Sequence, residues 1–464
     1  MNSPTDRVQI VSAFDRSPLR ELELSGENTI HGILERATVA FREGELPKSR
    51  RIEILENFLA LLKRDQEQLL STAIAEGGKP RRDTVVEFQR ACEGVRLGIH
   101  AFHEVHGEEV PMSLSKASAG RLAFTTLEPI GVVVSISAFN HPINLIIRQI
   151  VPPLVAGCPV IIKPDLRTPL SCVLLVDLLH EAGLPSEWCQ VALCSNVVAE
   201  KLATDSRVSF LSFIGSARVG WHLRSQLAPG TRCSLELGGV APVLIDEQVS
   251  LPEIVPPLLR GAFYHAGQVC VSVQKIYVPK AHFDEFAYLF VEGAKKLRVG
   301  DPNMEDTEVG PIIDSVQLHR IDTLVKASCS SGAELLCGGE VHMNTCYAPT
   351  VLRNPVPNCE IRRNEIFGPV VALIGYESRN DVYAEAHSLP YAFQASVFTN
   401  NYKVAFEALK NFPASALLVN DHTAFRVDWM PFGGARESGL GKGGIPQTVR
   451  EMSHEKLAIF SGLV

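Results

Sequence analysis

The stretch Ile130-Gly131-Val132-Val133-Val134-Ser135-Ile136-Ser137-Ala138 decides the fold class. It is apolar except for its glycine and two serines, and most of its residues are β-branched. Runs of this kind are typical of strands in a parallel sheet, because helices cover both faces of such a sheet and leave no polar side. We therefore predict a strand over residues 130–138 that is buried on both faces.

Helices and strands alternate after this run. The next predicted elements are a helix over residues 143–154, a strand over 159–163, a helix over 168–182 and a strand over 208–213. Thr168 suits the N-cap of its helix, and Gly183 suits the position after the helix end. This alternation predicts an α/β fold built on a parallel sheet.

The alternation starts again after the paired glycines Gly238 and Gly239. Because 464 residues exceed the size that one hydrophobic core normally reaches, we predict two Rossmann-like domains with a boundary near residues 237–240. The strands predicted for the second domain are residues 243–246, 275–278, 370–376, 396–398 and 416–420. Helices are predicted over residues 283–297 and 315–331.

The remaining segments flank these two regions. Residues 1–27 are polar and predicted to form loops, whereas apolar residues recurring on one face predict helices over 48–75 and 84–105. Residues 122–128 and 457–460 are predicted strands. We expect these two strands to lie in a small sheet outside both domains.

Composition and charge exclude several classes of function. Hydrophobic residues make up 46% of the chain and charged residues 21%, which is ordinary for a soluble enzyme. The net charge of −8 and the lack of a basic stripe argue against a nucleic-acid partner. The apolar run near residues 143–156 is too short and too interrupted to span a membrane. Residues 1–6 show no secretory signal.

The cysteines indicate a reducing compartment. There are 11 of them, an odd number, and no two are spaced as CxxC. A disulfide scaffold or a structural metal site is therefore not expected, and we predict a cytoplasmic protein.

Two motifs carry the candidate chemistry, Leu235-Glu236-Leu237-Gly238-Gly239 and Gly267-Gln268-Val269-Cys270. A cysteine nucleophile needs a neighbour that takes a proton, and a thioester needs a base that activates water. Cys270 is the candidate nucleophile, and Glu236 is the candidate base. Glu236 has apolar neighbours on both sides, which predicts partial burial, with an ion pair to Arg232 as the alternative. No cation adjoins Cys270, so its thiolate must be favoured by backbone dipoles or by a bound positive charge.

Asn140 follows the buried run at the carboxyl end of its strand, where α/β sheets place their ligands. Its carboxamide N–H is a candidate for stabilising an oxyanion. The alternative is that Asn140 caps the helix that follows it.

The two motifs resemble, in wording and separation, the active site of the aldehyde dehydrogenase superfamily, from roughly residue 50 to the C-terminus. The wording is most similar to the branch that acts on lactaldehyde, phosphonoacetaldehyde and glyceraldehyde phosphate. The resemblance implies that Cys270 attacks an aldehyde, that Asn140 stabilises the oxyanion, and that Glu236 activates the water that hydrolyses the thioester. It also implies a cofactor-binding domain (1–108 and 129–238), a catalytic domain (239–436) and an oligomerisation element (109–128 and 450–464) in a homodimer or homotetramer.

The resemblance further implies a site for NAD or NADP. The residues that match the family's cofactor contacts are Lys163, Gly215, Ser216, Leu237, Glu365 and Phe367. Leu166 occupies the position where the family commonly has a glutamate that favours NAD, so the choice between the two cofactors stays open. Arg167 either attracts a 2′-phosphate or is a solvated surface charge.

The substrate is predicted to be a small aldehyde with a hydroxyl group or one negative charge. Arg426 and His141 are expected to bind its polar tail, and Phe425 is expected to line the same tunnel. Gly443 stands where the family often has a glutamate that assists proton transfer. Two other readings stay open, a cofactor-independent thiol esterase or hydrolase and a non-catalytic protein that kept the fold.

Overall fold

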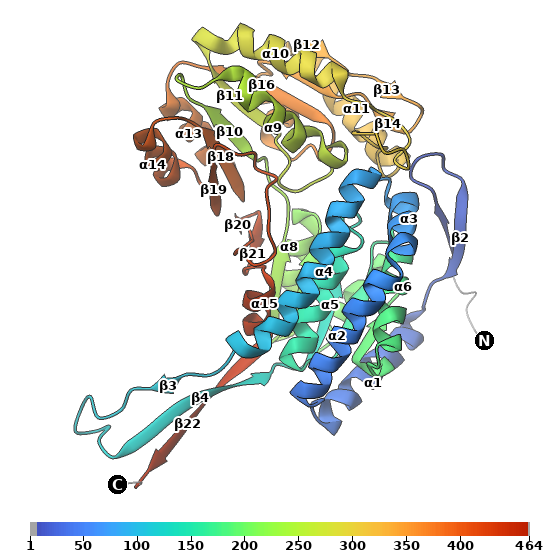
Figure 1. The fold of residues 1–464 in the computed structure, drawn as a ribbon, viewed down its shortest axis with the longest axis vertical. Coiled ribbons are helices and arrows are strands. Elements are labelled where there is room, and N and C mark those ends of the chain that lie inside the picture. Colours follow the sequence, from blue (N-terminus) through green and yellow to red (C-terminus); the bar gives the residue numbers. More distant parts are fainter. Residues whose placement is uncertain (1–6, 463–464) are drawn as a thin grey trace.

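The computed structural model describes residues 7–462 and contains two lobes and a projecting arm (Figure 1). The first lobe is built on a six-stranded sheet in the order β21-β9-β8-β5-β6-β7. All pairs in it are parallel except β21 with β9. Its strands are β5 (Val132–Ile136), β6 (Val160–Lys163), β7 (Cys189–Val191), β8 (Val208–Ile214), β9 (Arg232–Glu236) and β21 (Gly439–Leu440).

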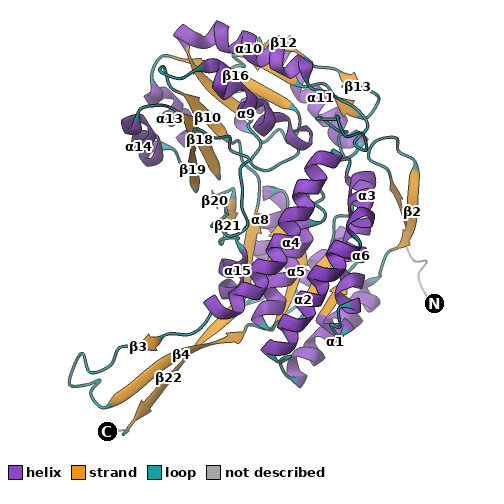
Figure 2. Cartoon of the chain, viewed as in Figure 1, coloured by secondary structure: helices purple, strands orange, loops and turns teal. Residues whose placement is uncertain are grey.

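Strand β5 lies at the centre of the first lobe, and all five of its residues are buried. Helices cover this sheet (Figure 2), and a separate apolar core lies on each face of it. The predicted parallel α/β fold is therefore confirmed. The helices of this lobe are α1 (Glu27–Glu43), α2 (Lys48–Arg64), α3 (Gln66–Gly77), α4 (Arg81–Glu104), α5 (Asn144–Ala156), α6 (Leu170–Glu181), α7 (Asn196–Ala203), α8 (Ala217–Gln226) and α15 (Ile445–Glu451).

The second lobe is built on a seven-stranded sheet in the order β12-β15-β16-β11-β10-β18-β19, with β12 as its antiparallel edge. Its strands are β10 (Pro242–Ile245), β11 (Lys275–Pro279), β12 (Glu334–Cys337), β15 (Thr350–Arg353), β16 (Val370–Tyr376), β18 (Gln394–Phe398) and β19 (Ala416–Val419). Its helices are α9 (Leu251–Phe263), α10 (Phe283–Lys296), α11 (Ser315–Ser330), α12 (Glu360–Arg363), α13 (Arg379–Ser388) and α14 (Tyr402–Asn411).

The arm consists of β3 (Glu109–Val110), β4 (Arg121–Pro129) and β22 (Ser453–Ser461), and it projects away from both lobes (Figure 1). Strand β22 pairs with β4 along its whole length, from Ser453 opposite Pro129 to Ser461 opposite Arg121. Phe124 stacks on Phe460, with ring centroids 5.8 Å apart. The predicted strands near residues 122–128 and 457–460 therefore lie in one small sheet. None of the helices within residues 7–462 is long and apolar enough to cross a membrane.

Three predictions are corrected by the structure. The loop predicted for residues 1–27 is, in its described part, a hairpin of β1 (Arg7–Val11) and β2 (Pro18–Glu23); residues 1–6 lie outside the described chain. Strand β2 faces solvent on nearly every residue, so it lacks the apolar pattern that predicts a strand. The single helix predicted over 48–75 is two helices, which meet at Asp65.

The third correction concerns Thr168, which does not cap α6. The carboxylate of Glu76, in α3, instead accepts hydrogen bonds from the backbone N–H groups of Leu170 and Ser171 at 2.7 and 2.9 Å. A distant side chain thus caps this helix, and local sequence cannot reveal such a partner. The remaining short elements are β13 (Val341–His342), β14 (Cys346–Tyr347), β17 (Tyr391–Ala392), β20 (Ala435–Arg436) and the 3-10 turns Ser186–Trp188, Tyr264–Gly267 and Lys280–His282.

Candidate functional site

A cavity of about 790 Å³ is lined by residues of both lobes, a volume typical of small-molecule sites. The candidate residues that line it are Asn140, His141, Lys163, Gly215, Ser216, Glu236, Leu237, Cys270, Glu365, Phe367 and Arg426. Phe425 is different, because it is 44% exposed while its neighbours Ala424 and Arg426 line the cavity. The structure corrects the expectation for Phe425 and places Phe432 in the cavity wall instead.

Cys270 follows a sharp backbone turn. His265, Ala266 and Gly267 all have positive φ, at 48°, 53° and 68°, a conformation that is costly for residues with a side chain. A Cβ atom on Gly267 would collide with the carbonyl oxygen of Gly368, so only glycine fits there. The turn brings Cys270 out of the core to the cavity surface.

The thiol of Cys270 is protonated in this environment at neutral pH. Burial raises its pKa to about 12, and the negative charges of Glu365 and Glu236 act in the same direction. Arg426 and Arg148 oppose this shift. A thiolate at Cys270 therefore requires an additional positive charge or a nearby base, as the sequence led us to expect.

Asn140 is 5% exposed, and its amide Nδ2 donates to the carbonyl oxygen of Gln268 at 2.9 Å. This bond ties Asn140 to the segment that carries Cys270. The alternative that Asn140 caps α5 is wrong, because Glu87 Oε1 accepts from the backbone N–H groups of Ile143 and Asn144 at 2.8 and 3.0 Å.

Glu236 ends strand β9 and forms an ion pair with Arg148 of α5. A second guanidinium, of Arg426, lies 3.8 Å from its other carboxylate oxygen. The partial burial expected for Glu236 is confirmed, and so is an ion pair, but its partner is Arg148. Arg232 donates instead to the carbonyl oxygen of Ser453 at 2.7 Å. The sequence signal for Arg148 was present: it is the one charged residue of a mostly apolar helix.

The arginine cluster consists of Arg90, Arg148 and Arg426, which surround the buried carboxylate of Asp428. Arg90 binds Asp428 through two hydrogen bonds of 3.1 and 3.0 Å, while Arg148 Nε and Arg426 Nε lie 3.8 and 3.5 Å from its Oδ1. Together with Glu236, three guanidinium groups face two carboxylates, which leaves one positive charge in excess. Sequence reasoning found only Arg426 of this cluster.

Part of this cluster is unpaired. Arg426 Nε and Nη2 and Arg148 Nη1 are buried, and no atom within residues 7–462 accepts a hydrogen bond from them. Burial lowers the pKa of Arg426 to about 9, and the charge of Arg148 adds to that effect. The guanidinium of Arg426 also lies 3.5 Å from the centroid of the Phe432 ring. Unsatisfied buried donors of this strength are well suited to an anionic ligand.

His141 lines the cavity but does not act as a cation. Its Nδ1 lies 2.6 Å from the Nζ of Lys79, which is ion-paired with Glu87. Burial lowers the pKa of His141 to about 4, and the charge of Lys79 contributes. His141 therefore stays a candidate for a hydrogen bond to a polar tail, but it supplies no positive charge.

The same cavity carries the residues predicted to bind a dinucleotide. Lys163 is nearly buried, and its Nζ lies 3.5 Å from the side-chain oxygen of Asn196. Arg167 is not a free cation, because it binds Asp165 through Nε and Nη2 and Asp314 through Nη1. These ion pairs disfavour one of the two alternatives left open for Arg167, namely that it attracts a 2′-phosphate.

The turn from β8 into α8 places Gly215 and Ser216 in the cavity wall, with the amino end of the helix behind them. Free backbone N–H groups at such a helix start bind phosphate. Glu365 is held below Gly238, where a Cβ atom would collide with its carboxylate. Its buried Oε1 has no hydrogen-bond partner in the described part of the chain, and burial raises its pKa to about 7. A ribose hydroxyl would satisfy this oxygen, so these residues fit a dinucleotide.

The chain is similar to known proteins over nearly its whole length. Residues 1–458 match the profile described as "Aldehyde dehydrogenase family". The chain is 33% identical over 457 residues to the 3-sulfolactaldehyde dehydrogenase of Priestia aryabhattai, with 98% of this chain and 95% of that protein covered.

Two solved structures superimpose closely. Aldehyde dehydrogenase 21 from Physcomitrella patens, in complex with the reaction product succinate, matches with a TM-score of 0.95 and 29% identity and covers 100% of this chain and 96% of that one. Glyceraldehyde-3-phosphate dehydrogenase GapN from Methanocaldococcus jannaschii, complexed with NADP, matches with a TM-score of 0.94 and 29% identity and covers 99% of this chain and 100% of that one.

Proposed function

This chain belongs to the aldehyde dehydrogenase family, and we propose that it oxidises a small anionic aldehyde to its carboxylate with NAD or NADP. The match confirms the resemblance drawn from the motifs around Glu236 and Cys270 and extends it to the N-terminal residues. The observation that carries the substrate class is the arginine cluster, whose unpaired guanidinium atoms lie buried beside Glu236.

The negative group of the substrate is proposed to bind Arg426 and Arg148. Arg426 Nη2 and Arg148 Nη1 are buried without a hydrogen-bond partner in the described residues, and the planar fork of a guanidinium matches a carboxylate or sulfonate. The excess positive charge of the cluster is offset when such an anion enters. The names of two relatives agree with this class, since one acts on 3-sulfolactaldehyde and one was solved with succinate.

The reacting end of the substrate is proposed to lie at Cys270. The Cys270 thiol loses its proton to water and its sulfur attacks the aldehyde carbon. The resulting oxyanion accepts hydrogen bonds from the Asn140 amide and the Cys270 backbone N–H. A bound NAD or NADP would supply the hydride acceptor, and Cys270 would then carry the acyl group as a thioester. Glu236 then takes a proton from a water molecule, whose oxygen forms the new bond to carbon as the bond to sulfur breaks.

The cofactor is proposed to lie between Lys163 and Glu365. Lys163 would hold the adenosine ribose, the start of α8 the pyrophosphate, and Glu365 the nicotinamide ribose, with Phe367 against the ring and Leu237 beside it. Because Leu166 supplies no carboxylate to repel a 2′-phosphate, we propose that both NAD and NADP are used.

The function is tested with a panel of aldehydes of equal chain length that end in a sulfonate, a carboxylate, a hydroxyl or a methyl group. Each is supplied with NAD and with NADP, and the absorbance of the reduced cofactor is followed. We expect the anionic aldehydes to give the highest kcat/KM. Ester hydrolysis without any cofactor reduction would instead select the esterase reading, and no thiol chemistry at Cys270 would select the non-catalytic one.

Replacing Arg426 by methionine tests the anion site. We expect kcat/KM to fall by about 10²–10³-fold for anionic aldehydes, because removing a buried charged partner typically costs 2–5 kcal/mol. Hydroxylated or methyl-terminated aldehydes should lose less than about tenfold by the same argument. The matched control is Arg20→Met, because Arg20 is an exposed arginine of the hairpin. Equal losses for charged and neutral aldehydes would contradict the assignment.

Gly443 tests how Glu236 is placed. A Cβ atom on Gly443 would collide with Glu236 Oε1 and approach Arg148 Nη2 to 2.8 Å. Gly443→Ala is therefore expected to displace the carboxylate and lower kcat by about tenfold to a hundredfold, as small displacements in active sites do. Gly26→Ala is the control, since nothing lies within 4 Å of a Cβ atom there. Steady-state rates and circular dichroism distinguish a misplaced base from a misfolded protein.

We further propose that residues 1–108 and 129–238 bind the cofactor, that residues 239–436 carry catalysis, and that the arm joins copies of the chain into a homodimer or homotetramer. Exposed apolar side chains on β22 support the last point, with Leu457 at 50%, Ile459 at 55% and Phe460 at 46% exposure. The free cysteines of the chain favour the cytoplasm. Light scattering of the purified protein measures the oligomeric state.

A further inference from the structure

Glu451 is the last residue of α15, and its carboxylate lies beside the segment 441–443 that passes Glu236. Glu451 Oε1 accepts a hydrogen bond from the backbone N–H of Lys442 at 2.9 Å. Its Oε2 is buried, and no partner for it is found in residues 7–462. Burying a carboxylate oxygen without a hydrogen-bond partner costs free energy, which suggests that this oxygen has a functional role.

Two glycines separate Glu451 from Glu236. A Cβ atom on Gly441 would come within 3.1 Å of both Glu451 oxygens, and one on Gly443 would collide with Glu236 Oε1. Residues two apart in a chain have Cα atoms at most about 7 Å apart, a span that one or two water molecules can bridge. The two carboxylates therefore face the same short stretch of backbone, which has no side chain at either position.

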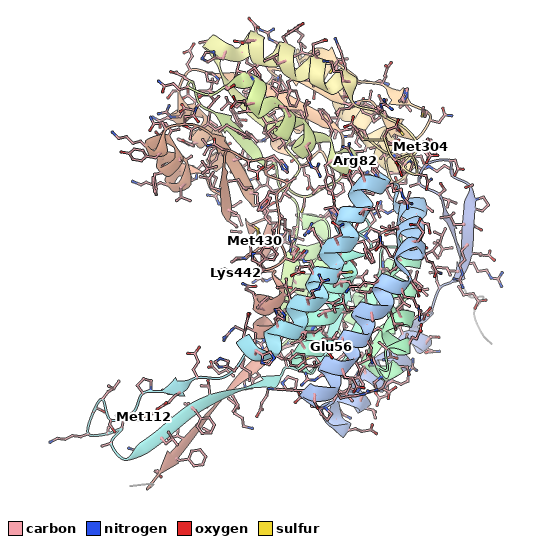
Figure 3. The ribbon with its side chains drawn as sticks, viewed as in Figure 1. Glu56, Arg82, Met112, Met304, Met430 and Lys442 are labelled. Atoms are coloured by element: carbon pink, nitrogen blue, oxygen red, sulfur yellow. The ribbon has the colours of Figure 1, made fainter. Side chains whose placement is uncertain are left out.

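Strand pairing fixes this arrangement. Gly439 pairs with Glu236 and Leu440 pairs with Leu235, so the chain that continues to Gly441 runs alongside Ser234. Helix α15 then returns the chain, and Glu451 comes back to the backbone of Lys442. Lys442 itself is exposed and lies at the surface on the side of α15 (Figure 3), so the path ends near solvent.

We propose that Glu451 is the positioning residue that relays the proton from Glu236 to solvent during hydrolysis of the thioester, and this inference rests on the proposed function. Glu236 takes the proton when the water oxygen bonds to the acyl carbon and the carbon–sulfur bond breaks. The proton then passes through a bridging water to Glu451 and from there to bulk water. Glu236 is thereby returned to its ionised form for the next turnover.

The surroundings of Glu451 suit proton transfer. The charged groups that face it are Glu236 and Arg232 from β9 and Lys442 from the passing segment. Burial raises the pKa of Glu451, and the charge of Glu236 adds to this, while the N–H of Lys442 and the cations Arg232 and Lys442 oppose it. A carboxyl group whose pKa is raised toward neutrality both accepts and releases a proton readily near neutral pH. Glu451 of α15 thus takes the place of the glutamate that the family often has at the position of Gly443.

Glu451→Gln tests the relay, because an amide oxygen still accepts from Lys442 but cannot carry a proton. The first turnover, which precedes hydrolysis, should show the wild-type burst of reduced cofactor, in rate and amplitude. The steady-state rate after the burst should fall by roughly tenfold, and high concentrations of a small buffer base should restore most of it. The solvent isotope effect on the steady-state rate should rise.

The matched control is Glu56→Gln, because Glu56 is exposed on α2, away from the arm; it should behave as the wild type. Glu451→Asp should keep part of the steady-state rate, since it retains a carboxylate. A wild-type steady-state rate in Glu451→Gln, or an equal loss in burst and steady state that buffer does not restore, would overturn the relay. If the wild-type protein oxidises no aldehyde at all, the proposed function fails instead, which the same assay reveals first.

Discussion

Replacing Cys270 by serine is expected to reduce aldehyde oxidation by about 10⁴-fold or more, because loss of a covalent nucleophile removes the whole acyl-enzyme route. A serine hydroxyl lacks a nearby base strong enough to ionise it in this cavity. The measurement is formation of reduced cofactor under saturating substrate. Cofactor binding should persist, since Cys270 is not among the candidate cofactor-binding residues.

The control for this variant is Cys359→Ser, because Cys359 is also a partly exposed free thiol. Its activity should equal that of the wild type. Labelling with a thiol reagent gives an independent reading at Cys270. Because the pKa of Cys270 is near 12, its thiolate fraction increases about tenfold for each unit by which the pH is raised below that value. The labelling rate should increase with it. Activity retained in Cys270→Ser would refute the mechanism.

Replacing Glu236 by glutamine is the second large effect that we expect. The burst of reduced cofactor should remain, because the chemistry before the thioester does not use this base. Steady-state turnover should then fall by about 10²–10⁴-fold, the usual contribution of a general base. Rapid mixing followed by mass spectrometry should detect the acyl group on Cys270.

This variant also breaks the ion pair with Arg148, which has a structural effect of its own. The matched control is Glu385→Gln, because Glu385 pairs with Arg362 at similar burial, with side-chain exposures of 20% and 13% against 15% and 5% for Glu236 and Arg148. Both variants should unfold at lower temperature, and only Glu236→Gln should lose turnover. Equal turnover in the two variants would show that Glu236 is not the base.

The order of elements could be predicted because it depends on local composition. The strand at residues 132–136 lies in a mostly apolar, β-branched run, and such a run is typical of a strand buried on both faces of its sheet. The helix at residues 283–296 begins with acidic and ends with basic side chains, which matches the helix dipole. The hairpin at residues 7–23 was missed because one of its strands is exposed on both sides and lacks an apolar face.

The site could be predicted only as far as its motifs extend. Cys270, Glu236 and Asn140 each stand in a recognisable short segment, and the structure brings all three to one cavity. Arg148 and Asp428 have no such segment. Arg148 comes from an apolar helix of one lobe and Asp428 from the chain beyond the second sheet, so their meeting depends on how the lobes pack.

The sequence by itself determined the fold class, the family and the candidate nucleophile, base and oxyanion donor, because these follow from periodicity and from short motifs. Only the tertiary structure decided the charges around them: the pairing of Glu236 with Arg148, the neutral state of His141 and the outward position of Phe425. The physical reason is that electrostatic interactions depend on distance and burial. Both quantities arise when segments far apart in the chain are packed together.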